Sequence, residues 1–386
     1  MNQHDASEFR FRPARLDDLK ALVAVEQTCF VQDRLSKRSL RRWIQSPHSI
    51  FLVIEADTGL AGYGLVWCHR GTRLARLYSL AVLPQMRGHG LAKKVLLELE
   101  KRSAKQGHLF MRLEVAKNNT SAIRLYESLG YRTFGEYSDY YDDHTDALRM
   151  QKTIRQVPEQ QIHQRATPWY QQTTEFTCGP AALMMAMASL DPDVPLCQPL
   201  ELDIWRDATT IFMTSGHGGC HPVGLALAAR SHGFDARVYL NTRNTLFVDG
   251  VRSENKKQIL GVVHQGFLEK AQEQDVEIVY EDISQAQVAA WLHQGYAVLI
   301  LISTFRLDGK KAPHWVTVTG VDDQCFYVHD PDLDTAGVDT YAQRSIDCQH
   351  LPIAREDFDK MSAFGSGRLR TAVAIRKPLE EAVKKQ

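Results

Sequence analysis

The sequence predicts an α+β protein built from two domains, and three observations support this class. Its 386 residues exceed the usual size of one domain. Helical and strand-like patterns alternate through the first part of the chain, and a polar, Gln-rich stretch without an apolar period follows them. Beyond that stretch another helix opens, and strands gather late in the sequence. We therefore expect one domain over residues 8–154, a linker over 155–167 and a second domain over 168–377.

The first half is predicted from its apolar periods. Leu91, Val95, Leu96 and Leu99 recur at helical spacing, so residues 91–105 form an amphipathic helix. Short runs rich in apolar and β-branched residues between turn signals predict strands. The elements expected here are helices at 16–30, 91–105 and 121–129, and strands at 49–55, 62–69, 74–82 and 110–115.

The second half is predicted by the same criteria. Residues 297–303 form a wholly apolar run of strand length, which is typical of a buried strand. The other elements expected here are helices at 177–190 and 223–232, and strands at 315–321 and 325–329.

Composition excludes several classes of function. Lys and Arg number 46 and Asp and Glu also number 46, so the net charge of zero argues against a nucleic-acid or membrane-surface partner. No apolar run is long enough to span a bilayer, and the first residues lack a signal peptide's apolar core, so a cytoplasmic location is expected. The seven cysteines are irregularly spaced and form no CxxC pair, which favours neither a disulfide framework nor a zinc site.

One motif predicts an anion-binding turn in the first domain. Residues 80–92 read LAVLPQMRGHGLA, which is a strand, a glycine-containing turn and the start of a helix. Backbone N–H groups at such a helix N-terminus point at an anion, and the helix dipole favours negative charge. Gly88 and Gly90 let the backbone approach a pyrophosphate group. An ordinary strand-to-helix turn has the same pattern, so a second motif is needed.

The second motif lies at residues 113–131. Leu113, Glu114 and Val115 end a strand, Asn119 precedes a helix that contains Tyr126, and Leu-Gly-Tyr follows at 129–131. Together the two motifs resemble the GNAT acetyltransferase superfamily over residues 8–154, with the greatest likeness to ribosomal-protein N-terminal acetyltransferases. The resemblance implies the GNAT mixed α/β sheet fold and acetyl-CoA as the cofactor.

The resemblance also implies roles for individual residues. Glu114 would be the general base toward the acceptor ammonium, and Tyr126 the acid that protonates the departing thiolate. Asn119 would hold the pantetheine arm. The cofactor-binding residues implied are Leu80, Ala81, Val82, Arg87, Gly88, His89, Gly90, Leu91, Ala92, Asn119 and Tyr126. The alternatives are a half-buried packing role for Tyr126 and a solvated role for Glu114.

An acidic loop follows these motifs. It contains Asp139, Asp142, Asp143 and Asp146, together with Tyr137, Tyr140 and Tyr141. Negative charge beside an acceptor channel would attract an amine. A solvated loop without that role explains the same residues equally well.

A cysteine at a helix start is the strongest signal in the second domain. Residues 172–183 read QTTEFTCGPAAL, and Pro180 suits the first turn of a helix. Cys178 therefore lies at the helix N-terminus, where the dipole lowers a thiol pKa. A thiolate there is suited to nucleophilic catalysis.

A base and an orienting acid are expected far along the chain. His314 opens one strand and Asp330 follows the next, with the turn between them centred near Asp322. In an antiparallel hairpin, residues equidistant from the turn lie opposite each other. We expect the carboxylate of Asp330 beside the His314 imidazole, as in a catalytic triad. A one-residue slip or a bulge would separate them.

These residues resemble the papain-like peptidases that cut bacteriocin leaders after a double glycine. The resemblance covers residues 168–377 and implies a papain-like cysteine peptidase fold. It assigns Cys178, His314 and Asp330 to the triad and Gln172 to the oxyanion hole. The spacing of His217, Cys220 and His221 fits no zinc pattern, so no metal is expected and these residues are predicted to line the thiol cleft.

We interpret the chain as a bifunctional enzyme that acts on a peptide or protein substrate. One site would acetylate an amine, and the other would attack an amide through Cys178. Two alternatives remain open. The chain could be an acetyl-CoA-sensing, peptide-binding regulatory protein, or its second domain could be an acyl or peptidyl transferase.

Overall fold

The chain folds into two compact units, Met1–Glu159 and Gln160–Gln386. The structure, a computed structural model, describes residues 9–31, 33–141, 143–155, 163–212, 217–249, 251–307, 312–332 and 348–378. Residues 156–162 of the expected linker lie outside this set. At the linker's end, however, His163–Gln164 form strand β8, which pairs with strand β12 of the second unit. Two residues that pair through their main chains leave no sequence period, so this strand was not expected.

The first unit is a mixed sheet with helices on both faces. Its helices are α1 (Leu19–Cys29), α2 (Lys37–Gln45), α3 (Leu91–Lys105) and α4 (Thr120–Ser128), with 3-10 turns at Leu16–Asp18 and Pro84–Met86. Its strands are β1 (Arg10–Pro13), β2 (Ser49–Ala56), β3 (Gly59–Cys68), β4 (Leu74–Val82), β5 (Phe110–Ala116), β6 (Arg132–Tyr137) and β7 (Ala147–Thr153). The strand order is β1-β2-β3-β4-β5-β7-β6.

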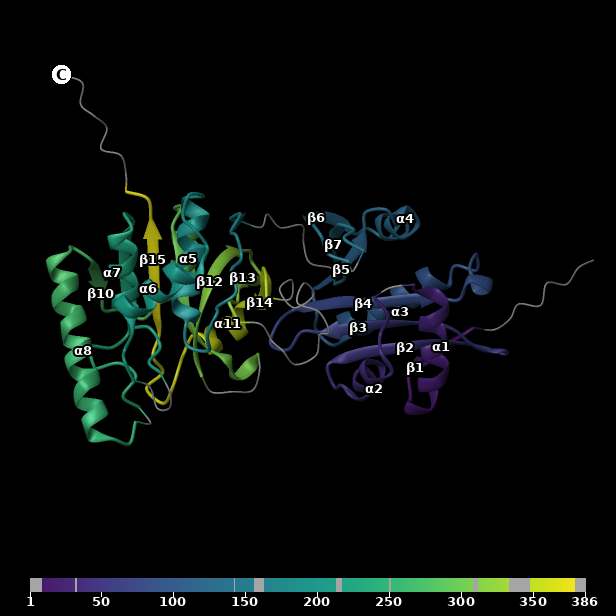
Figure 1. The fold of residues 1–386 in the computed structure, drawn as a ribbon, viewed down its shortest axis with the longest axis horizontal. Helices are drawn as coiled ribbons and strands as arrows, with labels where there is room; N and C mark the ends of the chain where they lie inside the picture. Colours follow the sequence, from purple (N-terminus) through teal and green to yellow (C-terminus); the bar gives the residue numbers. More distant parts are fainter. Residues whose placement is uncertain are drawn as a thin grey trace, which may run out of the picture. The chain divides into compact units, whose positions relative to one another are not determined.

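One pair of strands in this sheet is parallel. β4 pairs with β5 in parallel, whereas the other neighbouring strands run antiparallel. Figure 1 shows β5, β6 and β7 set apart from β1 to β4. The apolar stripe predicted for residues 91–105 is buried, because Leu91, Val95, Leu96 and Leu99 of α3 pack against the sheet.

The second unit is built on a larger mixed sheet. Its helices are α5 (Cys178–Leu190), α6 (Gln198–Ala208), α7 (Pro222–Ser231), α8 (Glu254–Glu273), α9 (Gln285–His293) and α11 (Arg355–Met361), with a 3-10 turn at Thr304–Arg306. Its further strands are β9 (Asp235–Leu240), β10 (Glu277–Val279), β11 (Ala297–Ser303), β12 (Pro313–Val321), β13 (Cys325–His329), β14 (Leu351–Ala354) and β15 (Thr371–Arg376). The strand order is β10-β9-β15-β11-β12-β13-β14, with β8 beside β12.

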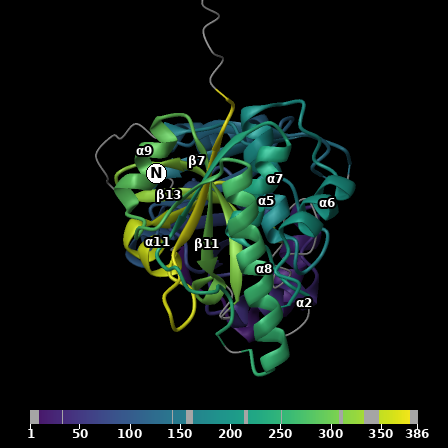
Figure 2. The ribbon, with the colours of Figure 1, turned by 90° about the vertical axis from the view of Figure 1, so that its left-hand side faces the viewer.

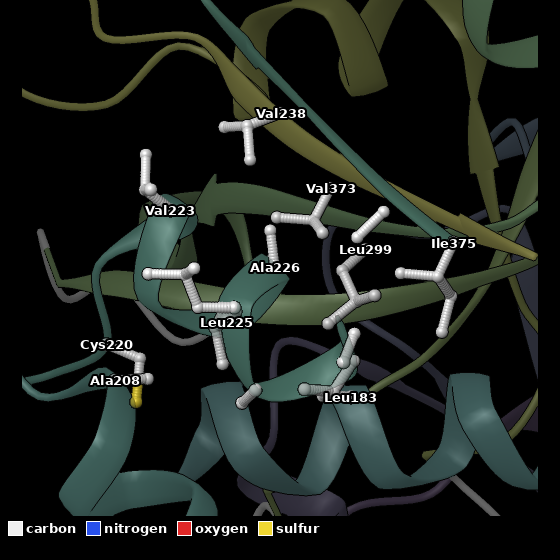
Figure 3. Packing of buried hydrophobic residues seen from close by; sticks show 14 of the residues in the cluster. Leu183, Ala208, Cys220, Val223, Leu225, Ala226, Val238, Leu299, Val373 and Ile375 are labelled. Carbon is white, nitrogen blue, oxygen red and sulfur yellow. The ribbon is translucent and has the colours of Figure 1, made fainter. Parts of the chain in front are cut away.

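Helices cover both faces of this second sheet. Figure 2 shows α5, α6, α7 and α8 on one side and α9 and α11 on the other. The core on the α5 side is formed by small and branched apolar residues, several of which Figure 3 shows lying together: Leu183, Ala226, Leu299, Val373 and Ile375. α5 is buried along almost its whole length, so it forms the central helix on which Cys178 is placed.

The predicted fold class is confirmed, with additions. Each helix and strand expected from the sequence is present, with small differences at its ends. The elements that were not expected include helices α2 and α8, whose buried apolar stripes are narrow. They also include the strands at the sheet edges, such as β10 and β14, which are short. Among the described residues, no helix combines the length and the apolar character needed to cross a membrane.

Candidate active sites

The first candidate site lies where β4 and β5 diverge. Their ladder covers only three residue pairs and ends at Arg76 opposite Arg112. Beyond Arg76, β4 continues to Val82 while paired on its other edge with β3. The main chain of Leu80, Ala81 and Val82 therefore lines a gap in the sheet, and peptide groups at such an open edge can bind an extended amide.

The predicted anion-binding turn follows this open edge. Gly90 is the N-cap of α3 in the left-handed region at φ 69°, and Gly88 has φ 86°. A Cβ at either position would meet no neighbour within 4 Å, so space is open around the turn. No side chain caps α3, which leaves its first N–H groups, including those of Leu91 and Ala92, facing outward. This turn fits a pyrophosphate group.

The side chains predicted to help bind the cofactor are partly engaged. Arg87 Nε donates to the Val82 carbonyl at 3.3 Å, and His89 Nδ1 lies 3.1 Å from the Arg87 carbonyl. Asn119 caps α4, since its Oδ1 accepts from Ala122 N–H at 3.2 Å. The amide Nδ2 of Asn119 is therefore the group available for a pantetheine arm.

Glu114 forms a buried ion pair at the point of divergence. Arg76 Nη2 lies 2.8 Å from Glu114 Oε2, and the two side chains are 5% and 3% exposed. Arg76 also donates to the Tyr140 hydroxyl at 3.0 Å. Oε1 of Glu114 is buried and accepts no hydrogen bond from any residue that the structure describes. A buried carboxylate oxygen without a donor is suited to an incoming ammonium group.

Tyr126 is buried on α4, where its ring packs against that of Tyr131. Burial raises the pKa of its hydroxyl to about 12, so it keeps its proton at neutral pH. Tyr141 is close enough to Glu114 to respond to its charge, because burial and the Glu114 carboxylate both raise the pKa of Tyr141. Tyr141 was expected only as part of the acidic loop, and Arg76 was not singled out.

The acidic loop itself is largely self-paired. Asp139 contacts His144, Asp143 accepts from Thr145 N–H, and Asp146 pairs with Lys117. Asp142 lies outside the described residues. Tyr140 instead contacts Arg76, the ion-pair partner of Glu114, and the pKa of Tyr141 responds to the charge of Glu114.

The second candidate site is built around Cys178 at the first residue of α5. The next residue must be small, because a Cβ at Gly179 would lie 2.8 Å from Cys220 Cβ and 3.3 Å from Trp315 Cδ1. Cys220 is thus packed beside the nucleophile. Burial and the neighbouring Cys178 raise the pKa of the Cys220 thiol well above its usual value, so Cys220 stays protonated.

His314 and Asp330 meet, although the hairpin differs from the one expected. Nε2 of His314 lies 2.6 Å from Asp330 Oδ1. The turn runs from Asp322 to Cys325, so its centre lies later than Asp322, and a bulge interrupts the ladder between Val318 and Gly320. The observed Cα partners are Thr317–His329, Val318–Val328, Gly320–Tyr327 and Val321–Phe326.

The later turn and the bulge shift the strand register away from the expected one in opposite directions. Together they displace it by two residues, and an even displacement keeps His314 and Asp330 on the same face. They therefore meet diagonally rather than directly opposite each other. The turn starts at Asp322 because its Oδ1 accepts from the N–H groups of Gln324 and Cys325, both at 2.7 Å.

The electrostatics of His314 favour its protonated form beside Cys178. Burial alone lowers the pKa of His314, but the charges of Asp330 and Cys178 and hydrogen bonds to both outweigh it and raise this pKa well above its usual value. Nε2 is taken by Asp330, so Nδ1 is the ring nitrogen left for Cys178. A protonated imidazole held between a carboxylate and a thiol is the arrangement that activates a cysteine as a nucleophile.

Gln172 lies near the triad in a segment ordered by several hydrogen bonds. Its main-chain N–H donates to Pro331 O at 2.9 Å, directly after Asp330. Its side-chain Nε2 donates to Thr174 O at 2.9 Å, which leaves one N–H of the amide for another acceptor. Its Oε1 is buried and receives no hydrogen bond from the described residues.

A cleft of about 500 Å³ opens beside Cys178. Its walls combine aromatic residues, such as Phe176, Phe247 and Phe364, with polar ones, such as His217 and Asp249. A mainly apolar cleft with a few polar groups is typical of a binding site for an organic or peptide substrate.

Of the three residues predicted to line the thiol cleft, His217 and Cys220 do so and His221 does not. Both nitrogens of His221 are engaged: Nδ1 accepts from Val223 N–H and Nε2 lies 2.9 Å from His264 Nδ1. His221 is therefore a structural N-cap of α7. In the described part of the chain, no group of three His, Cys, Asp or Glu side chains could hold a metal ion.

Folds and sites together define two classes of domain on one chain. One is a GNAT acetyltransferase domain, and the other is a papain-like domain with a Cys–His–Asp arrangement. The chain belongs to the Peptidase_C39 like family, whose model matches residues 167–376. The model of the Acetyltransferase (GNAT) family matches residues 19–131. Both resemblances are confirmed, and so is acetyl-CoA as the cofactor of this class of domain.

Relatives of known name match the first unit. A protein of Bacillus subtilis (strain 168), named as a candidate ribosomal protein bS18-alanine N-acetyltransferase, is 28% identical over 146 residues, which are 38% of this chain and 95% of that protein. The N-terminal acetyltransferase A complex catalytic subunit NAA10 of Arabidopsis thaliana is 28% identical over 153 residues, which are 37% of this chain and 77% of its own. The crystal structure of the ribosomal-protein-S18-alanine N-acetyltransferase from Escherichia coli covers 39% of this chain and 97% of its own at 25% identity, with a TM-score of 0.36.

Proposed function

We propose that the chain is a bifunctional enzyme that acetylates an amine of a peptide or protein and cleaves an amide bond through Cys178. The GNAT domain and the membership of the Peptidase_C39 like family support the two reaction classes. The observation that carries the second activity is the 2.6 Å contact between His314 and Asp330, with Cys178 close enough to raise the pKa of the same imidazole.

In the first unit, the residues of the chain supply binding and proton transfer. When bound, acetyl-CoA supplies an activated acetyl group. The turn at Gly88 and Gly90 would hold its pyrophosphate, and the open edge of β4 would hold its amide-containing arm. Glu114 Oε1 would accept a proton from the acceptor ammonium, and Tyr126 would supply a proton from its hydroxyl.

In the second unit, covalent catalysis would follow from the ion pair. The thiolate of Cys178 attacks the substrate carbonyl, and His314 then gives its proton to the leaving amine. Asp330 keeps the imidazole oriented through Nε2. The side-chain amide of Gln172 would donate to the carbonyl oxygen as negative charge develops on it.

Peptides are proposed as the substrates of both sites. The Bacillus subtilis and Arabidopsis thaliana relatives are named for acetylation of protein N-termini or of a ribosomal protein, which favours a peptide or protein acceptor. The mixed aromatic and polar cleft beside Cys178 is compatible with an extended peptide. We also propose a cytoplasmic location, because all seven cysteines are free thiols, as expected in a reducing compartment.

Incubation of a peptide library with the full chain and acetyl-CoA tests both activities in one experiment. Mass spectrometry would show peptides that gain an acetyl group and peptides that are shortened. We expect Glu114→Gln to lower only acetylation and Cys178→Ala to abolish only cleavage. Cleavage that persists in Cys178→Ala, or acetylation that is unchanged in Glu114→Gln, would contradict the corresponding assignment. Addition of a free amine distinguishes hydrolysis from peptidyl transfer by the mass of the product.

A further inference from the structure

A fully buried carboxylate lies outside the triad, on helix α6. Glu201 has no exposed surface, and a buried charge is retained only where it is well hydrogen-bonded. Its Oε1 accepts from Thr173 N–H at 2.8 Å, and its Oε2 accepts from Thr173 Oγ1 at 2.7 Å and from the Tyr170 hydroxyl at 3.0 Å. All three donors belong to residues 170–173.

The segment held by Glu201 is the one that carries Gln172. On its other side, Gln172 N–H donates to the carbonyl of Pro331, which directly follows Asp330. The Trp169 indole likewise donates to the Asp330 carbonyl at 2.7 Å. The main chain around Gln172 is thus fixed between α6 and the end of β13, with Glu201 as the charged group on the α6 side.

We propose that Glu201 is a positioning residue that holds Gln172 in place for stabilisation of the oxyanion. This inference rests on the proposed thiol-peptidase function. Hydrogen bonds to a carboxylate are stronger than neutral ones, so Glu201 restrains the loop more than a neutral residue would. A donor acts on the transition state only when its geometry is preorganised, and a loop alone provides little rigidity.

A double-mutant cycle in the full chain tests the proposal. The variants are Glu201→Gln, Gln172→Ala and their combination, assayed on a cleaved peptide from the library. We expect kcat to fall ~100-fold in Gln172→Ala and ~10-fold in Glu201→Gln, with KM changed less than about 2-fold. The double variant should be no slower than Gln172→Ala, because Glu201 acts only through Gln172.

Two controls separate positioning from general damage. Asp203→Asn changes an exposed carboxylate on the same helix that pairs with Arg206, and it should leave kcat unchanged. The rate at which iodoacetamide labels Cys178 should stay at the wild-type value in Glu201→Gln, because the thiol is paired with His314 and not with Gln172. If Glu201→Gln fails to fold, Tyr170→Phe and Thr173→Val each remove one hydrogen bond to Glu201 and enter the same cycle, with an expected fall in kcat of ~3-fold.

The outcomes distinguish this inference from the function on which it rests. A wild-type chain that cleaves no peptide, or a Cys178→Ala variant that cleaves equally well, removes the peptidase proposal itself. If the wild type cleaves and Cys178→Ala does not, unchanged kcat in Glu201→Gln overturns the positioning role. So does a loss that simply multiplies that of Gln172→Ala, since Glu201 would then act independently.

Discussion

At the scale of single residues, opposing effects determine the pKa of the His314 imidazole. Burial lowers its pKa, while Asp330 and Cys178 raise it and prevail. The protonated form is therefore favoured up to a pH above the usual range for histidine. The ion pair with Cys178, and the nucleophilicity that depends on it, should be lost only as the pH rises through that raised pKa.

We predict that Asp330→Asn shifts the alkaline limit of this pH dependence downward. Removal of a carboxylate 2.6 Å from Nε2 removes one of the charges that raise the pKa of His314. The limit should move to lower pH by at least about one unit. The measurement is the rate of Cys178 alkylation between neutral and alkaline pH, with mass spectrometry to identify the labelled cysteine.

Asp357→Asn is a matched control, because Asp357 is a carboxylate of the same unit whose ion pair is with Arg306 rather than with His314. An alkaline limit that is the same in Asp330→Asn and the wild type would show that Asp330 does not control the protonation of His314.

The buried pair of Arg76 and Glu114 provides a second prediction. Glu114→Gln leaves the guanidinium of Arg76 without its counter-charge, which should lower the free energy of unfolding of the first unit by ~3 kcal/mol. Acetylation should fall further than this loss of stability explains. The checks are denaturant unfolding and acetylation rates under conditions where the variant is folded.

Glu100→Gln is the comparison for this variant. Glu100 pairs with Lys152, also within the first unit, and that lysine is 20% exposed. A smaller destabilisation with normal acetylation is expected. Equal loss of acetylation in both variants would mean that Glu114 contributes only to stability.

The residues that the sequence predicts and those that it misses differ in a physical way. Cys178, Gly88 and Gly90 are marked by their local sequence, because a helix N-terminus and a left-handed turn each restrict the residue types nearby. Arg76 and Glu201 carry no such local mark. Their roles depend on contacts with residues about 30 to 40 positions away, and a local sequence pattern does not predict such contacts.

At the scale of elements, the β12–β13 hairpin brings His314 and Asp330 together as predicted, although its register differs from the expected one. The expected turn centre near Asp322 was wrong, since Asp322 opens the turn by capping two N–H groups. The bulge at Thr319 was also unforeseen, although Gly320 beside it is the kind of residue that often marks a bulge inside a strand. Only the parity of the combined displacement decides which face a side chain occupies, and here the parity is even.

The turn before α3 supports a prediction at the same scale. Gly90→Ala places a Cβ on a residue at φ 69°, which costs ~1 kcal/mol, and the turn should relax away from its geometry. We expect the affinity for acetyl-CoA to fall at least ~10-fold in calorimetric titration, because the turn presents the α3 N–H groups to the pyrophosphate.

Gly59→Ala is the control for backbone strain. Gly59 has φ 118° at the first residue of β3, directly after the turn from β2. A Cβ there would again meet no atom within 4 Å, and the residue lies outside the predicted cofactor site. The substitution should cost at least as much stability as Gly90→Ala, because φ 118° lies further from the backbone conformations that L residues adopt. It should leave the affinity for acetyl-CoA unchanged. An equal loss of affinity in both variants would point to general destabilisation of the sheet.

At the scale of the whole molecule, the chain carries two complete cores. The first encloses α3 against β2, β3 and β4, and the second encloses α5 and α7 against the sheet centred on β11 and β15. Each predicted site uses residues of one unit: Glu114 and Tyr126 in the first, and Cys178, His314 and Asp330 in the second. The residues predicted for either site therefore all come from a single unit.

Separate cores predict two unfolding transitions and a selective response to the cofactor. A ligand stabilises only the cooperative unit that binds it, by ~2.7 kcal/mol at a hundredfold excess over Kd. In differential scanning calorimetry of the full chain, acetyl-CoA should therefore raise the Tm of one transition by several degrees and leave the other in place. Gly90→Ala should reduce this shift, whereas Cys178→Ala should not alter it. A single transition that moves as a whole would instead mean that the two units unfold as one cooperative structure, so that occupancy of the acetyl-CoA site would stabilise the thiol site as well.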